Sequence, residues 1–197
     1  MIERINLHNL WVETAGRKGK QLSLDETDMR NISFDSLRFE QGYFSECNFS
    51  GMHFEDVDFY NAEFYSCDFF GCTFTNCNFR KATLDYSQFK NAVFSNCAFP
   101  RTDAYCTQFT GGHFLNCSFV GINLMEAILD SSTLELIDMD GAYLDQVSTQ
   151  NAVFQNLINT DSITHISIIP NKTNSTQLLS GADALEWMER TNHEGGS

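Results

Sequence analysis

Large apolar residues recur at every fifth position from Leu24 to Asn159, a spacing that suits neither a helix nor a flat strand. The 28 positions in this phase hold 17 Phe, six Leu and two Met, and the exceptions are Ala104, Thr149 and Asn159. A step of five residues rotates by about 140° on an α-helix, and on a strand it changes the face. The chain must therefore turn by a fixed angle every five residues, which predicts a solenoid.

Each repeat has the same order of polar and apolar residues around its central residue, i. Position i−2 is small or apolar, and positions i−1, i+1 and i+2 are mostly polar, as in Ala62-Glu63-Phe64. This pattern resembles the pentapeptide-repeat family, whose motif is Ala-Asp/Asn-Leu/Phe-x-x. The resemblance extends over residues 22–161, about 70 % of the chain, without an insertion.

The resemblance implies an all-β fold, a right-handed quadrilateral parallel β-helix with four repeats per coil and about seven coils. Residues twenty apart would then stack, with i and i−2 pointing inward, and the body would be about 34 Å tall at a strand spacing of about 4.8 Å. Backbone groups would pair with the coils above and below, and the Phe rings would form columns along the axis. The two columns that stand out run from Phe34 to Phe154 and from Phe39 to Asn159.

The two ends of such a rod expose apolar layers and unpaired strand edges, so both ends need caps. Residues 1–21 form the expected N-terminal cap and lead-in, with Leu10, Trp11 and Val12 placed to cover the first coil. The repeat body follows at residues 22–161. The chain is therefore expected to fold as one domain with small terminal additions.

The C-terminal segment, residues 162–197, is expected to form a cap strand, a short helix and a disordered tail from Thr191. The strand is His165-Ile166-Ser167-Ile168-Ile169, which Pro170 ends. The apolar residues that share one face of the helix are Leu178, Ala182, Leu185 and Met188. That face could cover the last coil, or it could pair with a second copy in a homodimer.

Six of the seven cysteines occupy the slot at i−2, where other repeats hold Ala, Val or Ile. They are Cys47, Cys67, Cys72, Cys77, Cys97 and Cys117. This placement indicates small hydrophobic residues in a reducing compartment, and no Cys or His spacing suits a metal site. We therefore expect no metal and no cofactor. The expected location is the cytoplasm, because the sequence shows no signal peptide and no apolar run long enough to span a membrane.

No catalytic constellation is present in the sequence, so we expect a protein that is not an enzyme. His53 and His113 share position i−1 on one side of the rod, but three coils, about 14 Å, separate them. No nucleophile elbow, phosphate loop or zinc-protease motif occurs. The carboxylates would lie on a convex surface that cannot desolvate a pair of them.

The acidic composition narrows the class of partner. A net charge of −14 argues against direct binding of nucleic acid or an anionic membrane, which require basic surfaces, and it suits a basic protein. Residues 22–61 carry a net charge of −7, residues 62–121 are neutral, and residues 122–161 carry seven acids and no Lys or Arg. The candidate partner-binding acids in this last segment are Glu126, Asp130, Glu135, Asp138, Asp140 and Asp145.

Apolar residues also occupy some positions that should face outward. They are Val93, Ala98, Pro100, Leu115 and Val120, on two adjacent sides of the fourth and fifth coils. Such a patch can mark a protein contact, so Leu115 and Val120 join the candidate partner-binding residues. Tyr43, Tyr65, Tyr105 and Tyr143 are expected to point outward along another side. They could bind a partner or pack against one another.

Two functions remain open. The resembled family includes small acidic proteins that mimic duplex DNA, bind DNA gyrase or topoisomerase IV, and protect it from quinolones or peptide toxins, usually as dimers joined by C-terminal helices. The resemblance thus implies a topoisomerase partner and a homodimer through Leu178, Leu185 and Met188. The alternative is an interaction scaffold of effector or immunity type whose target is unrelated to DNA. Binding by charge would weaken with salt, whereas contact through the apolar patch would hardly change.

Overall fold

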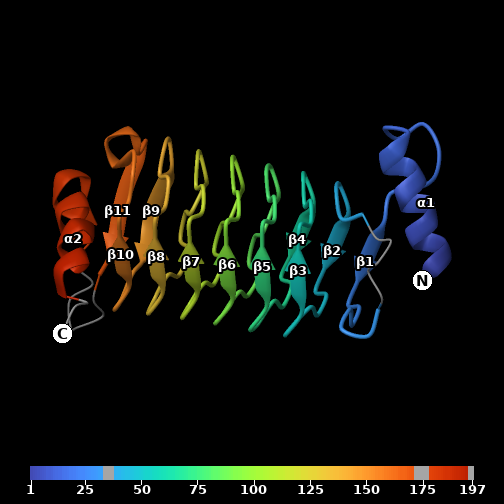
Figure 1. Ribbon diagram of the computed structural model, residues 1–197, viewed down its shortest axis with the longest axis horizontal. Coiled ribbons are helices and arrows are strands. Elements are labelled where there is room, and N and C mark those ends of the chain that lie inside the picture. Colours follow the sequence, from blue (N-terminus) through green and yellow to red (C-terminus); the bar gives the residue numbers. More distant parts are fainter. Residues whose placement is uncertain (33–37, 171–177, 195–197) are drawn as a thin grey trace.

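The computed structural model describes residues 1–32, 38–170 and 178–194 of the chain. Figure 1 shows a row of stacked coils with helix α1 (Ile2–Glu13) at one end and helix α2 (Gly181–Glu194) at the other. The body is a right-handed parallel β-helix of about seven turns, which confirms the fold expected from the five-residue repeat. The repeat therefore determines the body, and the helices close its ends.

Three sheets run along the axis of the rod (Figure 1). The first comprises β1 (Ser23–Asp25), β2 (Tyr43–Ser45) and β4 (Glu63–Tyr65). The second comprises β3 (His53–Glu55), β5 (Thr73–Thr75), β6 (Val93–Ser95), β7 (His113–Leu115), β8 (Thr133–Glu135) and β10 (Val153–Gln155). The third comprises β9 (Tyr143–Ser148), β11 (His165–Ile169) and β12 (Leu179–Ser180), and a 3₁₀ turn, η1 (Thr160–Ser162), precedes β11.

The register between neighbouring coils is twenty residues wherever the structure describes the repeat body. Phe54 pairs with Phe74, which pairs with Phe94, and isolated bridges continue the same step where no strand is assigned. Four flat faces follow from this register, each with central residues twenty apart. Face 1 runs from Leu24 to Leu144, face 2 from Met29 to Thr149, face 3 from Phe54 to Phe154, and face 4 from Phe39 to Asn159.

The core is a set of ring columns. On face 3 the ring centroids of Phe54, Phe74, Phe94 and Phe114 lie 5.0, 4.9 and 4.6 Å apart, with interplanar angles of 8°, 5° and 4°. The expected column on face 4 stacks from Phe59 to Phe99 but turns edge-on at Phe119, with an interplanar angle of 80°. A third column, Phe49, Phe69 and Phe89, stacks equally closely on face 2. Phe34 lies outside the described residues.

The corner position i+2 adopts a left-handed backbone, a requirement that the sequence analysis did not recognise. Positive φ occurs at this position in coil after coil, for example 55° at Asn76 and 56° at Asn96. Asn and Gly tolerate this conformation best, and they fill many of these corners. On face 3 the amides also form a ladder, because Asn116 donates to Asn96, Asn96 to Asn76, and Asn76 to Asp56.

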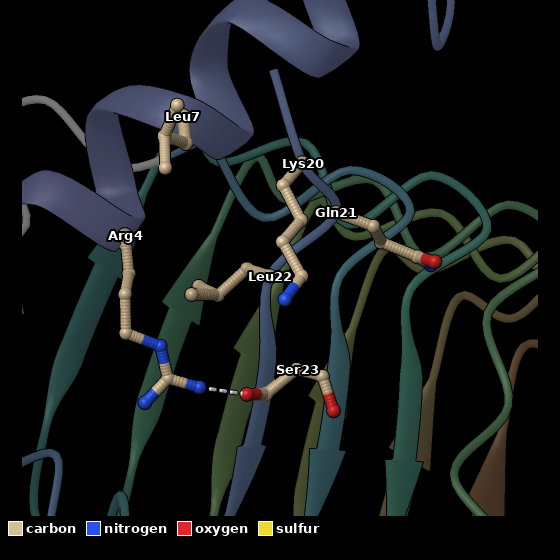
Figure 2. A pocket seen from close by; sticks show the side chains of 6 residues that line it. All are labelled: Arg4, Leu7, Lys20, Gln21, Leu22 and Ser23. Atoms are coloured by element: carbon tan, nitrogen blue, oxygen red, sulfur yellow. Dashed lines mark hydrogen bonds between the residues drawn. The ribbon is translucent and has the colours of Figure 1, made fainter.

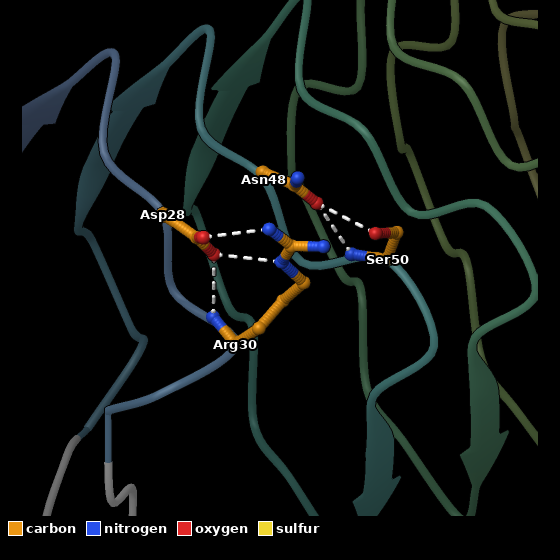
Figure 3. A network of polar contacts seen from close by, with 4 residues as sticks. All are labelled: Asp28, Arg30, Asn48 and Ser50. Carbon is orange, nitrogen blue, oxygen red and sulfur yellow. Dashed lines mark hydrogen bonds and ion pairs between the residues drawn. The ribbon is translucent and has the colours of Figure 1, made fainter.

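Position i−1 often carries Asp or Asn because its side chain caps the next turn. The Asp28 carboxylate accepts the backbone N–H of Arg30 at 3.1 Å, and the Asn48 side chain accepts that of Ser50 at 2.9 Å, one coil further on (Figure 3). Asp28 also forms an ion pair with Arg30 at 2.7 Å. The hydrogen bond from the Arg30 side chain lowers the pKa of Asp28 to about 2. The contacts in Figure 3 therefore stabilise the turns of face 2.

The N-terminal cap is a helix, which the sequence analysis did not predict. Ile5 and His8 of α1 are buried against the first coil, and Trp11 and Val12 are half-buried. Leu10, expected to cover the coil, is 38 % exposed. It lies on the outer side because Ile5 and His8, three residues apart, take the inner side of the helix.

His8 makes this cap sensitive to pH. Its Nδ1 accepts the backbone N–H of Leu22 at 2.9 Å, and its Nε2 is buried without a hydrogen-bond partner among residues 1–32, 38–170 and 178–194. Burial lowers the pKa of His8 below the ordinary value of 6.5. Arg38 and Glu40 also face the ring. The backbone of both residues and the charge of Glu40 oppose this shift, but burial has the larger effect. The folded chain therefore favours the neutral imidazole.

Acidification is accordingly expected to weaken the folded state through His8. Because the folded pKa is depressed, the stabilisation is present above the unfolded value and is lost as the pH falls below it. Urea unfolding should show a larger loss of stability from about pH 7.5 to about pH 5.5 in the wild type than in His8→Gln, whose amide oxygen can still accept the Leu22 N–H. An equal loss in both proteins would show that carboxylates alone set the pH dependence.

The C-terminal helix covers the last coil. Ala184 and Met188 of α2 are buried, and Trp187 packs edge-on against Phe154 at 6.2 Å. Two residues of the predicted face do not take part, since Leu178 precedes the helix and Ala182 is exposed. The helix begins only at Gly181, so its buried side differs from the predicted one. It extends through Glu194, and the predicted disordered tail from Thr191 is therefore helical for its first four residues. Residues 195–197 lie outside the described residues.

Candidate interaction surfaces

Face 1 carries the densest single-sign charge of the rod. Its seven repeats contain eight acids and no Lys or Arg: Asp25, Glu26, Glu46, Glu63, Asp85, Asp103, Glu126 and Asp145. Face 2 has three acids and two bases, and face 4 has five acids and four bases. The described part of face 3 has three acids and no base. The six bases of the repeat body therefore all lie on faces 2 and 4.

The acids of face 1 are staggered rather than stacked. At position i+1 the column reads Asp25, Ser45, Tyr65, Asp85, Tyr105, Met125 and Asp145, so two coils without a carboxylate at this position lie between one acid and the next. At position i−1, Thr83 separates Glu63 from Asp103. Like charges directly opposite each other on neighbouring strands destabilise a sheet. The stagger keeps the face acidic while avoiding most of that repulsion; Glu26 and Glu46 are the one pair of acids in register on this face among the residues described.

Five of the six tyrosines of the chain also lie on face 1. Tyr43 and Tyr65 pack with ring centroids 5.7 Å apart, and Tyr86 and Tyr105 pack edge-on at 5.4 Å. Tyr143 stacks on His165 of β11 at 5.0 Å. The tyrosines therefore pack against neighbouring rings, which is one of the two alternatives expected from the sequence. Tyr86 nevertheless remains 52 % exposed.

Carboxylates and phenols on face 1 perturb one another. Burial raises the pKa of Asp85, and the charge of Asp103 raises it further. Burial and the nearby Glu63 raise the pKa of Tyr65, whose hydroxyl donates to that carboxylate at 3.2 Å. A hydrogen bond with Cys106 and the charge of Glu126 raise the pKa of Tyr105 to about 12. Burial or a hydrogen bond is the main cause of each shift, and the neighbouring carboxylates Asp103, Glu63 and Glu126 add to it in the same direction.

The structure does not bring the six predicted C-terminal acids together. Glu126 and Asp145 lie on face 1, Asp130 on face 2, Glu135 on face 3, and Asp138 and Asp140 on face 4. Several also have structural partners: Asp130 accepts from Ser148 and Gln150, Asp138 accepts from Asn159 and the Asp140 N–H, and Asp145 accepts from Ser167. A surface defined by these six residues would have to encircle the rod.

The predicted apolar residues are only partly accessible. Leu115 on β7 is 45 % exposed, and Val93 on the neighbouring β6 is also exposed. Val120 on face 4 is half-buried, as are Ala98 and Pro100. The structure adds Leu136, at the i+2 corner of face 3, to the exposed apolar residues. The exposed apolar residues of face 3 thus lie on three successive coils, but none is in register with another, because Val93 is opposite His113 and Leu115 is opposite Ser95 and Glu135.

A pocket of about 520 Å³ lies between α1 and the first coil. Figure 2 shows Arg4 and Leu7 of α1 on one side, with Lys20, Gln21, Leu22 and Ser23 leading into β1 on the other. The Arg4 guanidinium donates to the Ser23 carbonyl, and the Arg4 and Lys20 side chains are exposed. This open pocket adds two cations to the N-terminal end of face 1.

The cysteines serve as packing residues, as their position in the repeat predicted. All seven are free thiols, and the six at i−2 are buried, whereas Cys106 is only partly buried. Five of these six sulfurs contact a backbone carbonyl of the coil before; the Cys97 thiol, for example, donates to the Phe74 carbonyl at 3.4 Å. Burial raises the pKa of Cys72 to about 12. Within the described ranges, no group of three or more His, Cys, Asp and Glu residues could hold a metal ion.

Most of face 1 is not apparent when the charges are counted by segments of the chain, because its acids recur at intervals of about twenty residues. Grouping the residues by their position modulo twenty would have collected Asp25, Glu46, Asp85 and Asp103 with the tyrosines, and it would have added Tyr86. The acidic, tyrosine-rich face is therefore encoded in the sequence, but it becomes visible only when residues twenty positions apart are grouped together.

Two family models match the sequence. One, described as a pentapeptide repeat region, matches residues 67–144. The other, described as pentapeptide repeats (8 copies), matches residues 43–76. No curated protein matches the chain at a significant level. In the described residues, no helix is long and apolar enough to cross a membrane.

Solved structures that match this chain share little sequence with it. HetL, a pentapeptide repeat protein involved in heterocyst differentiation regulation from the cyanobacterium Nostoc, is 14 % identical, covers 83 % of this chain and 95 % of its own, and has a TM-score of 0.35. Full-length QnrB1, a plasmid-mediated fluoroquinolone resistance protein, is 15 % identical, with coverages of 77 % and 92 % and a TM-score of 0.34. A protein of the Arabidopsis thaliana thylakoid lumen is 17 % identical, with coverages of 55 % and 61 % and a TM-score of 0.30.

Proposed function

The chain belongs to the pentapeptide-repeat family, and from this premise we propose that it is a non-enzymatic rod whose acidic surface stands in for duplex DNA. The proposed partner is a protein with a basic DNA-binding groove, of which DNA gyrase and topoisomerase IV are the expected examples. The cytoplasmic location expected from the sequence is part of the same proposal.

The linear charge density of the rod supports this proposal. The repeat body carries 20 acids and six bases over about 34 Å, which is about one net negative charge per 2.4 Å of axis. Duplex DNA carries about one per 1.7 Å. A groove that attracts DNA by charge would therefore attract this rod by the same long-range field.

The homodimer that the sequence suggested stays a prediction. Met188 is buried in the cap, and the half-buried Leu185 also packs against the core of the same chain. Leu178 alone among the three candidate dimer residues is exposed. A C-terminal dimer would therefore have to use the outer side of α2, and sedimentation of the pure protein would distinguish it from a monomer.

The function is tested by inhibition of DNA supercoiling. Added rod should inhibit gyrase or topoisomerase IV, or relieve an inhibitor that traps the enzyme on DNA. Its affinity should fall steeply from about 50 mM to about 200 mM salt, because the proposed attraction is electrostatic. Absence of both effects with both enzymes at low salt would refute the topoisomerase proposal.

A second candidate, an interaction scaffold of effector or immunity type, is favoured by the apolar surface of face 3. Val93 and Leu115 lie on adjacent strands and are both exposed, and such residues can form the centre of a protein contact. Binding through this surface would change little with salt. Leu115→Asp should abolish it while leaving a charge-driven contact nearly unchanged.

A further inference from the structure

We infer that face 1, and not the rod as a whole, is the docking surface for the basic partner, and that the partner presents arginine side chains to it. The identity of the partner rests on the proposed function. The preference of face 1 for arginine does not, because it follows from the residues of the face itself. The occupant is a protein surface or segment rich in Arg.

The distribution of cations among the faces is the first argument. Faces 2 and 4 hold all six Lys and Arg residues of the repeat body, so on those faces each approaching cation meets charge of its own sign. Face 1 offers eight acids and none of these bases. Arg4 and Lys20 line the pocket at the N-terminal end, and Lys81 and Arg101 lie at the corner where face 4 meets face 1. A basic surface would therefore be drawn to face 1 along the coils beyond the first.

The geometry of the acids is the second argument. Glu46, Asp103 and Glu126 are exposed, and the coil spacing sets neighbouring carboxylates along the face at multiples of about 4.8 Å. Because the acids alternate between positions i−1, i+1 and i+2, they form a zigzag across the width of the face. A guanidinium presents several N–H donors in one plane and can bridge carboxylates that a point charge cannot.

The tyrosines are the third argument, and they select Arg over Lys. Tyr86 is exposed and packs edge-on against Tyr105, whose hydroxyl lies 3.5 Å from Glu126. The pair thus offers an aromatic surface beside a carboxylate. Arginine stacks on aromatic rings more readily than lysine does and gains from the neighbouring negative charge. Face 3, acidic but without a tyrosine, lacks this combination.

A matched pair of charge variants tests the assignment with a deca-arginine peptide as the probe. The face 1 variant carries Glu26→Gln, Glu46→Gln, Asp103→Asn and Glu126→Gln, all at exposed positions. The control carries Glu55→Gln, Asp56→Asn, Asp140→Asn and Asp161→Asn, which are equally exposed and remove the same charge from faces 3 and 4. Thermal melting of both variants checks that the rod is intact.

The face 1 variant should bind the peptide at least about tenfold more weakly than the wild type at low salt, and the control should lose less than about threefold. Tyr86→Leu should weaken binding of deca-arginine more than binding of deca-lysine. Equal losses in the two charge variants would overturn the inference, because net charge alone would then explain binding. An equal effect of Tyr86→Leu on both peptides would remove the preference for Arg.

Supercoiling assays with the same proteins separate the two proposals. If the wild type does not act on gyrase or topoisomerase IV, the proposed function fails, and the peptide measurements still decide whether face 1 is the basic docking surface. If the wild type acts and the control variant loses as much activity as the face 1 variant, the function stands and the assignment of the face fails. Selective loss in the face 1 variant supports both.

Discussion

Replacement of Phe74 by Ala is expected to lower the free energy of unfolding by about 3–5 kcal/mol. The Phe74 side chain is fully buried, and its ring stacks between Phe54 and Phe94 at 5.0 and 4.9 Å. The coils above and below are fixed by backbone hydrogen bonds, so the cavity cannot collapse easily. Urea unfolding followed by far-UV circular dichroism measures the change.

Phe70 provides the matched control, since it is the one Phe of the chain outside the five-residue phase and is 51 % exposed. Phe70→Ala should change the stability by no more than about 0.5 kcal/mol, as surface substitutions usually do. If the two variants lost similar stability, the ring columns would not be the source of the core's free energy.

Met188→Asp is the second change with a large expected effect, and its result should be association of rods end to end. Met188 is 1 % exposed within α2, where an unpaired carboxylate cannot be accommodated. The helix should detach and uncover Phe154 and the open edge of the last coil. Exposed strand edges pair with other chains, so sedimentation should show species that grow with protein concentration.

Ala182→Asp is the control, because it adds the same side chain to an exposed position of the same helix. It should remain a single species with an almost unchanged melting temperature, since acids are tolerated near a helix N-terminus. A Met188→Asp protein that stayed dispersed at high concentration would show that α2 is not needed as a cap.

The body of the fold was predictable because one physical constraint repeats along it. Each central Phe or Leu must point inward, so the phase of these residues sets the coil, the register and the buried cysteines together. Helix α1 was not predictable in the same way. Its apolar residues Ile2, Leu7 and Leu10 lie outside and only Ile5 and His8 are buried, so no apolar stripe of helical period marks it.

The surface was less predictable because partners on a solenoid come from different coils. Asp85 and Tyr105 are twenty residues apart, yet the Asp85 carboxylate accepts the Tyr105 backbone N–H at 3.1 Å. Asp138 and Asp145 are close in the sequence and were expected to share one binding surface, but they lie on different faces. The ladder of Phe residues constrains only the inside, so the grouping of outward residues requires the register of the coils.

The twenty-residue register has a consequence for how such a chain can change over time. Gain or loss of one whole coil would alter the length of the rod by about 4.8 Å and leave every later side chain on its own face. Gain or loss of a single repeat would instead rotate everything after it by a quarter turn, so the column of Tyr143 and Asp145 would continue a different face. Length and surface composition can thus evolve separately only in steps of a full coil.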